Sequence, residues 1–172
     1  MKTALLLAIA LTGLLAPSSH SVAADGTFDL TTLAVGKEFP DFSEPDLDGK
    51  TASVGNFKGK IVLVDFWATW CGPCVAELPN VIKAYEKYHD KGFEIVGISL
   101  DKDKGRLTSF LKAKNMTWQQ VFDGNGWESK VAKKYQVQSI PATYLIGKDG
   151  KLLASNLRGE ALDKVLAKEL AK

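Results

Sequence analysis

Apolar residues along the chain occur either in short continuous runs or in stripes with helical spacing. Continuous runs cover residues 61–67 and 93–100, and such runs are typical of strands buried on both faces of a parallel sheet. Apolar positions three and four residues apart mark helices over residues 71–90, 104–114 and 160–171. These five segments predict alternating buried strands and amphipathic helices, with a helix at the C-terminus.

Shorter apolar segments, separated by turn residues, predict the remaining elements. They are, in chain order, a strand over 119–122, a helix over 128–135, and two antiparallel strands over 142–146 and 151–156 around Lys148-Asp149-Gly150. Asp48-Gly49 predicts a further hairpin within residues 39–53. This order predicts an α/β fold whose central mixed sheet, parallel first and antiparallel at the end, is flanked by helices.

The first 24 residues have the pattern of a secretory signal. A single charged residue, Lys2, precedes an apolar core at residues 4–16, and small residues follow up to Ala24. Cleavage after Ala23 or Ala24 fits this pattern. The core is shorter than the about 20 apolar residues that a membrane-spanning helix needs. We therefore expect an exported protein, in the periplasm or an equivalent space, with an uncleaved membrane anchor as the alternative.

The chain after the signal is predicted to form one domain with no membrane span. Residues 25–38 are a polar lead-in, of which we expect residues 25–36 to be loosely held, and residues 39–172 have the usual length of a single domain. Lys and Arg number 22 against 20 Asp and Glu, and the two signs are mixed along the chain. No basic patch with interleaved aromatic residues occurs in the sequence, so we expect neither nucleic acid nor an anionic membrane surface as a partner. We expect a monomer.

The only two cysteines, Cys71 and Cys74, stand in the motif WCGPC at residues 70–74. A disulfide that encloses two residues removes little loop entropy from the unfolded chain, so this pair is not expected to serve as a structural staple. Two thiols this close can form and open a disulfide in place, and a C-x-x-C between a strand and a helix is typical of thioredoxin-like redox sites. Zinc needs four ligands, and beyond the signal the chain offers only these cysteines and His89. We therefore expect no metal, and no cofactor.

Residues 64–74, VDFWATWCGPC, together with Glu77, Pro79 and the later Ile140-Pro141, resemble the thioredoxin superfamily. Three further features resemble its exported TlpA/ResA-like branch: the hairpin turn DGK at 48–50, the segment FKGK at 57–60, and the inserted strand and helix before Ile140-Pro141. The resemblance runs from about residue 39 to the C-terminus. It implies a thioredoxin-like fold with an N-terminal hairpin and a cis-proline loop. Gly147 departs from the branch, which often has an aspartate there.

Cys71 is predicted to be the attacking thiol and Cys74 the resolving one. Cys71 lies at the start of the predicted helix, where unpaired backbone N–H groups and the helix dipole favour a thiolate. The thiolate is the nucleophile in disulfide exchange. Cys74, three residues later on the same helical face, can then attack the mixed disulfide. The alternative is an unreactive pair.

Two acidic residues near the motif are candidates for tuning the thiols. Asp65 interrupts a continuous apolar strand, where desolvation should raise its pKa, and its carboxyl group could accept and return the proton of Cys74. The thioredoxin superfamily has its buried aspartate at this place, and the alternative is a solvated carboxylate at the edge of the sheet. Glu77, one turn after Cys74, resembles an acidic residue of the exported branch that helps to tune the thiols. The alternative for Glu77 is a solvated helix charge.

Two further positions are expected to contact the substrate. Trp70 directly precedes the attacking thiol and is expected to shape the contact surface, whereas Trp67 is expected in the core. Ile140-Pro141 matches the cis-proline loop of the family, which lies against the disulfide and leaves the preceding backbone free to pair with a substrate strand.

These residues predict an exported thiol-disulfide oxidoreductase that reduces protein disulfides. Gly72-Pro73 resembles thioredoxin and lacks a histidine that would stabilise the thiolate. Thioredoxin has a potential of about −270 mV, against about −120 mV for a strong periplasmic oxidant, so the resemblance implies the reducing direction. It also implies that apocytochrome c before haem attachment, or other exported proteins, are substrates and that a membrane thiol transporter supplies the electrons.

Three alternatives remain open. The same pair could oxidise its substrates instead of reducing them. It could serve a binding module without turnover, such as a redox sensor or a metal-handling protein, although no methionine-rich or histidine-rich tract supports copper. A peroxidase is disfavoured because the Thr-x-x-Cys spacing is absent: Thr69 stands two residues before Cys71.

Overall fold

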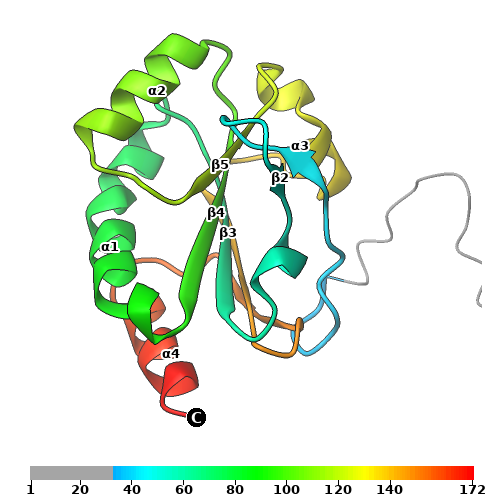
Figure 1. Cartoon of the computed structure of the whole chain (residues 1–172), viewed down its shortest axis with the longest axis vertical. Helices are drawn as coiled ribbons and strands as arrows, with labels where there is room; N and C mark the ends of the chain where they lie inside the picture. Colours follow the sequence, from blue (N-terminus) through cyan, green and yellow to red (C-terminus); the bar gives the residue numbers. More distant parts are fainter. Residues whose placement is uncertain (1–32) are drawn as a thin grey trace, which may run out of the picture.

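Two strands in which every residue is buried, β3 (Ile61–Trp67) and β4 (Phe93–Ser99), form the centre of the fold. In the computed structural model, which describes residues 33–172, they belong to a five-stranded sheet (Figure 1). The strand order is β5-β4-β3-β6-β7, with β5 at Gln119–Phe122, β6 at Ala142–Ile146 and β7 at Leu152–Ser155. The predicted signal at residues 1–24 and the lead-in residues 25–32 lie outside the described part.

The sheet is mixed in the way the sequence predicts. β3 pairs in parallel with β4, and β4 with β5, whereas β6 runs antiparallel to both β3 and β7. The parallel half is buried on both faces, which explains why its strands are continuously apolar. Because β3 and β4 are parallel, their carboxyl ends meet at one edge of the sheet, and the motif at residues 70–74 follows β3 at this edge.

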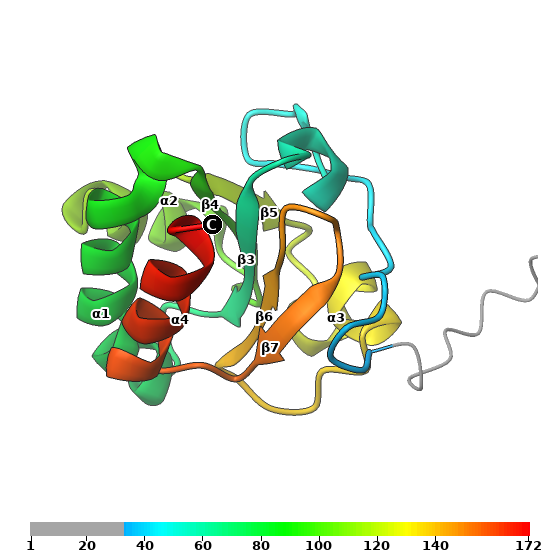
Figure 2. The ribbon, with the colours of Figure 1, turned by 90° about the horizontal axis from the view of Figure 1, so that it is seen from below.

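Helices cover both faces of the sheet. Figure 2 shows α1 (Gly72–Tyr88), α2 (Lys104–Ala113) and α4 (Glu160–Leu170) on one face and the short helix α3 (Lys130–Lys134) on the other. The predicted α/β architecture is therefore confirmed. None of the helices within residues 33–172 is both long and apolar enough to cross a membrane.

Neighbouring residues of β3 face opposite layers. Trp67 packs against Phe110 of α2, with ring centroids 5.7 Å apart. Phe66 packs against Tyr135 and Tyr144 on the opposite face, at 5.9 and 6.0 Å. Because side chains alternate along a strand, Asp65 shares the face of Trp67 and lies beneath α1 and α4.

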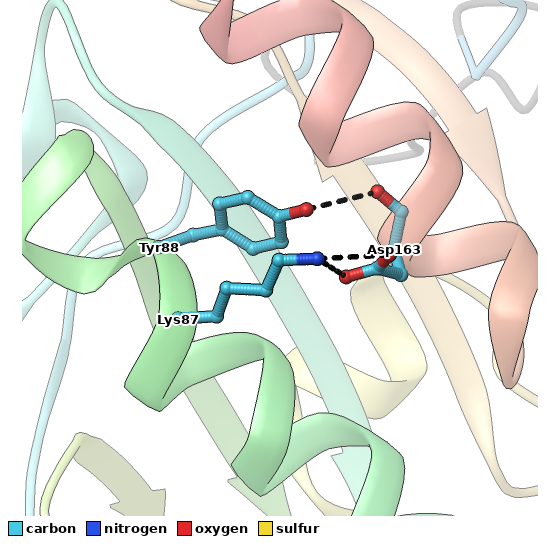
Figure 3. Close-up of polar contacts among 3 residues, drawn as sticks. All are labelled: Lys87, Tyr88 and Asp163. Carbon is cyan, nitrogen blue, oxygen red and sulfur yellow. Dashed lines mark hydrogen bonds and ion pairs between the residues drawn. The ribbon is translucent and has the colours of Figure 1, made fainter.

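The C-terminal helix α4 is held beside α1 (Figure 3). Leu162 and Leu166 bury the inner face of α4. Nζ of Lys87 lies 2.8 Å from a carboxylate oxygen of Asp163, and the hydroxyl group of Tyr88 donates to the Asp163 carbonyl oxygen over 3.5 Å. Exposed ion pairs of this kind contribute little to stability, so the buried leucines are the main attachment of α4.

The N-terminal segment lies along part of both edges of the sheet. The predicted hairpin is present as β1 (Glu44–Pro45) and β2 (Thr51–Ala52), with Gly49 at φ +80° in the turn. The hairpin is fixed beside β5 because the backbone N–H of Leu47 donates to the backbone carbonyl oxygen of Gln120. At the other edge, residues 36–39 exchange backbone hydrogen bonds with residues 150–152, so the end of the polar lead-in is not loosely held. Backbone groups that are paired in this way cannot pair with further strands.

Two predicted helices differ from the structure by more than one residue at their ends. The helix predicted over 128–135 is split into a 3₁₀ turn, η4 (Gly126–Glu128), and α3, because Ser129 between them has extended backbone with ψ of 133°. The helix predicted over 71–90 begins at Gly72, after Cys71 as its N-cap, and ends at Tyr88 before a 3₁₀ turn at His89–Lys91.

Candidate active site

The two cysteines lie at the N-terminus of α1. Cys71 is the N-cap residue with extended backbone, and the backbone N–H of Cys74 donates to its Sγ over 3.2 Å. The two sulfur atoms form a disulfide of 2.04 Å, with Cα atoms 5.2 Å apart. Both side chains are buried in this oxidised form. Sγ of Cys71 therefore accepts a hydrogen bond from a backbone N–H in the first turn of α1, as the position of Cys71 in the sequence predicts.

The turn that carries Cys71 is tied to the end of the neighbouring strand. Asp101, two residues beyond β4, is buried and accepts hydrogen bonds from the backbone N–H of Thr69 at 3.0 Å and from its hydroxyl group at 2.6 Å. The hydroxyl group of Ser99 donates to the same carboxylate over 2.9 Å. The sequence analysis missed Asp101. The sequence did contain a signal for it: Asp101 is a polar residue just after the predicted buried strand 93–100. Functional groups gather at the carboxyl ends of parallel buried strands, where the motif also lies.

The Ile140-Pro141 loop lies against the disulfide. Its peptide bond is cis, as the resemblance implies, and the carbonyl oxygen of Ile140 lies 3.7 Å from Sγ of Cys71. The loop leads directly into β6, which pairs with β3. The guanidinium group of Arg158 donates to the carbonyl oxygen of Pro141 over 2.7 Å, so this residue, also missed in the sequence, helps to hold the loop.

Asp65 lies behind the disulfide on the central strand of the sheet, not at its edge. It is 5 % exposed and lines a small cavity with Cys74, Glu77 and Pro141. The cavity offers about 10 Å³ to the centre of a water molecule, roughly the room for one water. Burial raises the pKa of Asp65 to about 7. The desolvated carboxyl group predicted from the sequence is therefore present, and the alternative of a solvated edge position is wrong.

Glu77 extends the site toward α4. Its carboxylate accepts the backbone N–H of Gly159 at 2.6 Å and the side-chain amide of Asn80 at 3.2 Å. Its negative charge adds to the rise in the pKa of Asp65, whereas the positive charge of Arg158 opposes it. Glu77 thus has defined partners in the fold and is not simply a solvated helix charge.

The two tryptophans near the motif have different environments. Trp67 is fully buried, as predicted, and its indole N–H donates to the side-chain oxygen of Gln120 over 3.0 Å. Trp70 is 46 % exposed, beside Trp127, which the sequence analysis did not single out.

The arrangement is suited to thiol-disulfide exchange. It brings together a closed disulfide at a helix start, a carboxyl group with a pKa near neutrality, and a cis Ile140-Pro141 loop whose Ile140 carbonyl oxygen lies beside Cys71. Within residues 33–172, no group of three or more His, Cys, Asp or Glu side chains is placed to hold a metal ion.

Comparison with known proteins agrees with this chemistry. Residues 35–155 match the AhpC/TSA family. The chain is 36 % identical over 140 residues to the thiol-disulfide oxidoreductase ResA of Bacillus thuringiensis subsp. konkukian, covering 81 % of this chain and 79 % of the relative.

Solved structures of similar proteins have the same fold. One is the thioredoxin domain of a thiol-disulfide oxidoreductase from Bacteroides vulgatus, with a TM-score of 0.71 and 34 % identity, covering 79 % of this chain and 97 % of that one. Another is a thiol:disulfide interchange protein from Bacteroides sp., with a TM-score of 0.72 and 33 % identity, covering 82 % and 93 %. The chain therefore belongs to the AhpC/TSA family of thioredoxin-like proteins and is a thiol-disulfide oxidoreductase.

Proposed function

We propose that this oxidoreductase is exported and reduces disulfides of other exported proteins. The observation that carries the proposal is the position of the Cys71–Cys74 disulfide, at the start of α1 and 3.7 Å from the Ile140 carbonyl oxygen. A substrate strand that pairs with this loop would bring its own disulfide to Cys71. Trp70, exposed beside Cys71, would contact the same substrate.

The reaction consists of two exchanges. In the reduced protein, the thiolate of Cys71 attacks one sulfur of the substrate disulfide, which forms a mixed disulfide and releases the other substrate sulfur as a thiolate. Cys74 then loses its proton and attacks Sγ of Cys71, which releases the second substrate thiolate and closes the disulfide of the structure. Two electrons pass to the substrate, and its two thiolates take up two protons.

Asp65 acts as the proton acceptor in the second exchange. It lines the same cavity as Cys74, and a carboxyl group with a pKa of about 7 can both accept and return a proton near neutral pH. The cavity has room for about one water that could relay the proton. Glu77 and Arg158 act through Asp65, because their opposite charges shift its pKa in opposite directions.

The reducing direction is supported by Gly72-Pro73, which places no positive charge beside the attacking sulfur. Equilibration with glutathione buffers, followed by chromatographic separation of the reduced and oxidised forms, measures the potential. We expect a value below about −220 mV and catalysis of insulin reduction. A value near −120 mV would instead identify the protein as an oxidant, which is the second candidate direction.

The proposed location and partners rest on the signal pattern and on the resemblance to the TlpA/ResA-like branch. We propose apocytochrome c or other exported proteins as substrates and a membrane thiol transporter as the electron donor. Fractionation of cells, with N-terminal sequencing of the mature protein, tests export: we expect a start at Asp25 or Ala24 outside the cytoplasm. A chain that retains Lys2 in the membrane fraction would indicate an uncleaved anchor.

A further inference from the structure

Trp70 and Trp127 present two exposed indole rings beside the disulfide. They are 46 % and 43 % exposed, and among residues 33–172 only one other large apolar side chain, Val35, is classed as exposed. Their ring centroids lie 6.2 Å apart, although one residue precedes α1 and the other belongs to η4. Adjacent exposed aromatic rings of this kind are typical of an interaction site.

The two rings line one groove of about 240 Å³, together with the segment that follows β4 and the first turn of α2. Gly126 belongs to this groove and has φ of +58°. A Cβ atom there would lie 2.9 Å from Cε of Lys102, so the glycine lets the aliphatic part of this lysine lie against η4. The apolar surface therefore continues from Trp127 onto the lysine side chain.

The charged groups of the groove differ in whether they have partners. The carboxylate of Asp101 is buried and bound by Thr69, and that of Asp103 accepts the backbone N–H of Arg106 at the start of α2. The side chains of Lys102 and Arg106 make no ion pair within the part of the chain that the structure describes. With two carboxylates and two cations the groove is formally neutral, so it selects a partner through short-range contacts rather than long-range attraction.

We propose that this groove binds the segment of a protein substrate beside its disulfide, and that it favours an aromatic residue followed by an acidic residue next to the cysteine. The proposal rests on the reductase function proposed above and names its substrate class. Trp70 directly precedes Cys71, so a substrate whose sulfur meets Cys71 brings its neighbouring side chain to the indole pair. An aromatic side chain packs well on such rings. The adjoining carboxylate can pair with Lys102 or Arg106.

Peptide substrates test this preference directly. Three peptides of equal length share one intrachain disulfide and differ only beside the first cysteine, with phenylalanine and aspartate, phenylalanine and lysine, or two alanines. The reduced full-length protein is mixed with each, and the rate constant is measured by acid quench and chromatography. Bis(2-hydroxyethyl) disulfide, which is small and uncharged, reports on the thiol chemistry alone.

For the wild type we expect the peptide with phenylalanine and aspartate to react at least about fivefold faster than the alanine peptide, the effect of a residue that contributes measurably to an interface. Trp127→Ala should clearly lower this ratio, whereas Trp127→Phe, which keeps a ring, should retain most of it. Lys102→Gln combined with Arg106→Gln should remove the preference for aspartate over lysine. The matched control is Lys112→Gln combined with Lys114→Gln. These lysines lie at the C-terminal end of α2, away from the groove, so both ratios should stay unchanged.

Equal rates for the three peptides with the wild type, or an unchanged ratio in Trp127→Ala, would overturn the proposed groove while leaving the reductase function intact. Failure of the wild type to reduce bis(2-hydroxyethyl) disulfide would instead overturn the reductase function, and the substrate class with it. The two failures are therefore distinguishable.

Discussion

The carboxylate of Glu77 accepts the backbone N–H of Gly159 over 2.6 Å, and so joins the second turn of α1 to the start of α4. Gly159 has no side chain to cap α4 and adopts φ of +52°, a conformation that favours glycine. The neighbouring residue, Arg158, donates to the Pro141 carbonyl oxygen. The loop before α4 therefore binds Glu77 of α1 and also carries Arg158. The negative charge of Glu77 raises the pKa of Asp65, and the positive charge of Arg158 lowers it.

We predict that Glu77→Gln lowers the pKa of Asp65 below about 7 and that Arg158→Gln raises it. Removing a nearby negative charge favours the ionised carboxylate, and removing a nearby positive charge disfavours it. Glutamine at position 77 can still accept the Gly159 N–H, so this variant isolates the charge. The measurement is a carbon NMR titration of the Asp65 carboxyl group in the oxidised protein, where the thiols do not titrate.

Lys112→Gln, which removes an exposed charge from α2, is the control and should leave this titration unchanged. Shifts of the same sign in Glu77→Gln and Arg158→Gln would show that the two charges do not act on Asp65 in the way the structure indicates.

The unequal environments of the two cysteines lead to a prediction about trapping. Cys71 receives the N–H of Cys74 and adjoins the Ile140 carbonyl group, whereas Cys74 lies deeper, against Asp65. Cys74→Ser should therefore accumulate mixed disulfides with protein substrates in cells, and Cys71→Ser should accumulate few. Non-reducing electrophoresis with mass spectrometry measures the trapped species and identifies the substrates. Equal trapping by both variants would contradict the assignment of Cys71 as the attacking thiol.

Most of the fold could be predicted because its signals are local. Continuous apolar runs identified β3 and β4, and Asp48-Gly49 identified the N-terminal hairpin. The helix after β5 was predicted as one piece because side-chain spacing does not reveal the extended backbone at Ser129, which ends η4 before α3 begins. The edge pairing of residues 36–39 was missed because those residues carry no strand pattern. Their backbone bonds to the β6–β7 turn and the start of β7, and the packing of Phe39 on Tyr135, order them.

Only those site residues could be predicted that belong to a recognisable sequence motif. Cys71, Cys74 and Asp65 lie within ten residues of one another, and the family pattern includes Pro141. The contact between Thr69 and Asp101 spans 32 residues, and that between Glu77 and Gly159 spans 82. Such pairs depend on how strands and helices are placed in space, so no local pattern reveals them.

Thr69→Val tests the contact that fixes the turn before Cys71. The variant keeps the shape of the side chain but removes the hydroxyl donor that lies 2.6 Å from the buried carboxylate of Asp101. We expect a loss of about 1–3 kcal/mol in the free energy of unfolding, the usual effect of leaving a buried acceptor with fewer partners. Urea denaturation of the oxidised protein measures it. Thr108→Val removes an exposed hydroxyl group that donates to Gly105 and should change stability by less than about 0.5 kcal/mol; an equal loss in both variants would argue against a special role for Asp101.

Asp65→Asn should stabilise the folded protein at neutral pH. The pKa of Asp65 is raised from 3.8 in the unfolded chain to about 7 in the folded protein, so the folded state binds its proton more tightly. The contribution of Asp65 to stability is therefore most favourable below pH about 4, falls as the pH rises toward 7, and stays lower above that value. Asparagine cannot ionise, and removing the charge should recover on the order of 1–4 kcal/mol at neutral pH. Urea denaturation of both oxidised proteins between about pH 4 and pH 8 measures the difference.

The same substitution should slow the reaction while it stabilises the fold, and this opposition separates a catalytic role from a structural one. Without the carboxylate, the proton of Cys74 loses the acceptor that lines its cavity, so the attack of Cys74 on the mixed disulfide should be slower. Its rate, measured by quenched flow with a peptide disulfide, should also lose the pH dependence that wild-type protein shows near pH 7. Asp48→Asn, at an exposed position in the N-terminal hairpin, should change neither quantity. If Asp65→Asn alters stability but not this pH profile, Asp65 is a buried structural group and another acceptor takes the Cys74 proton.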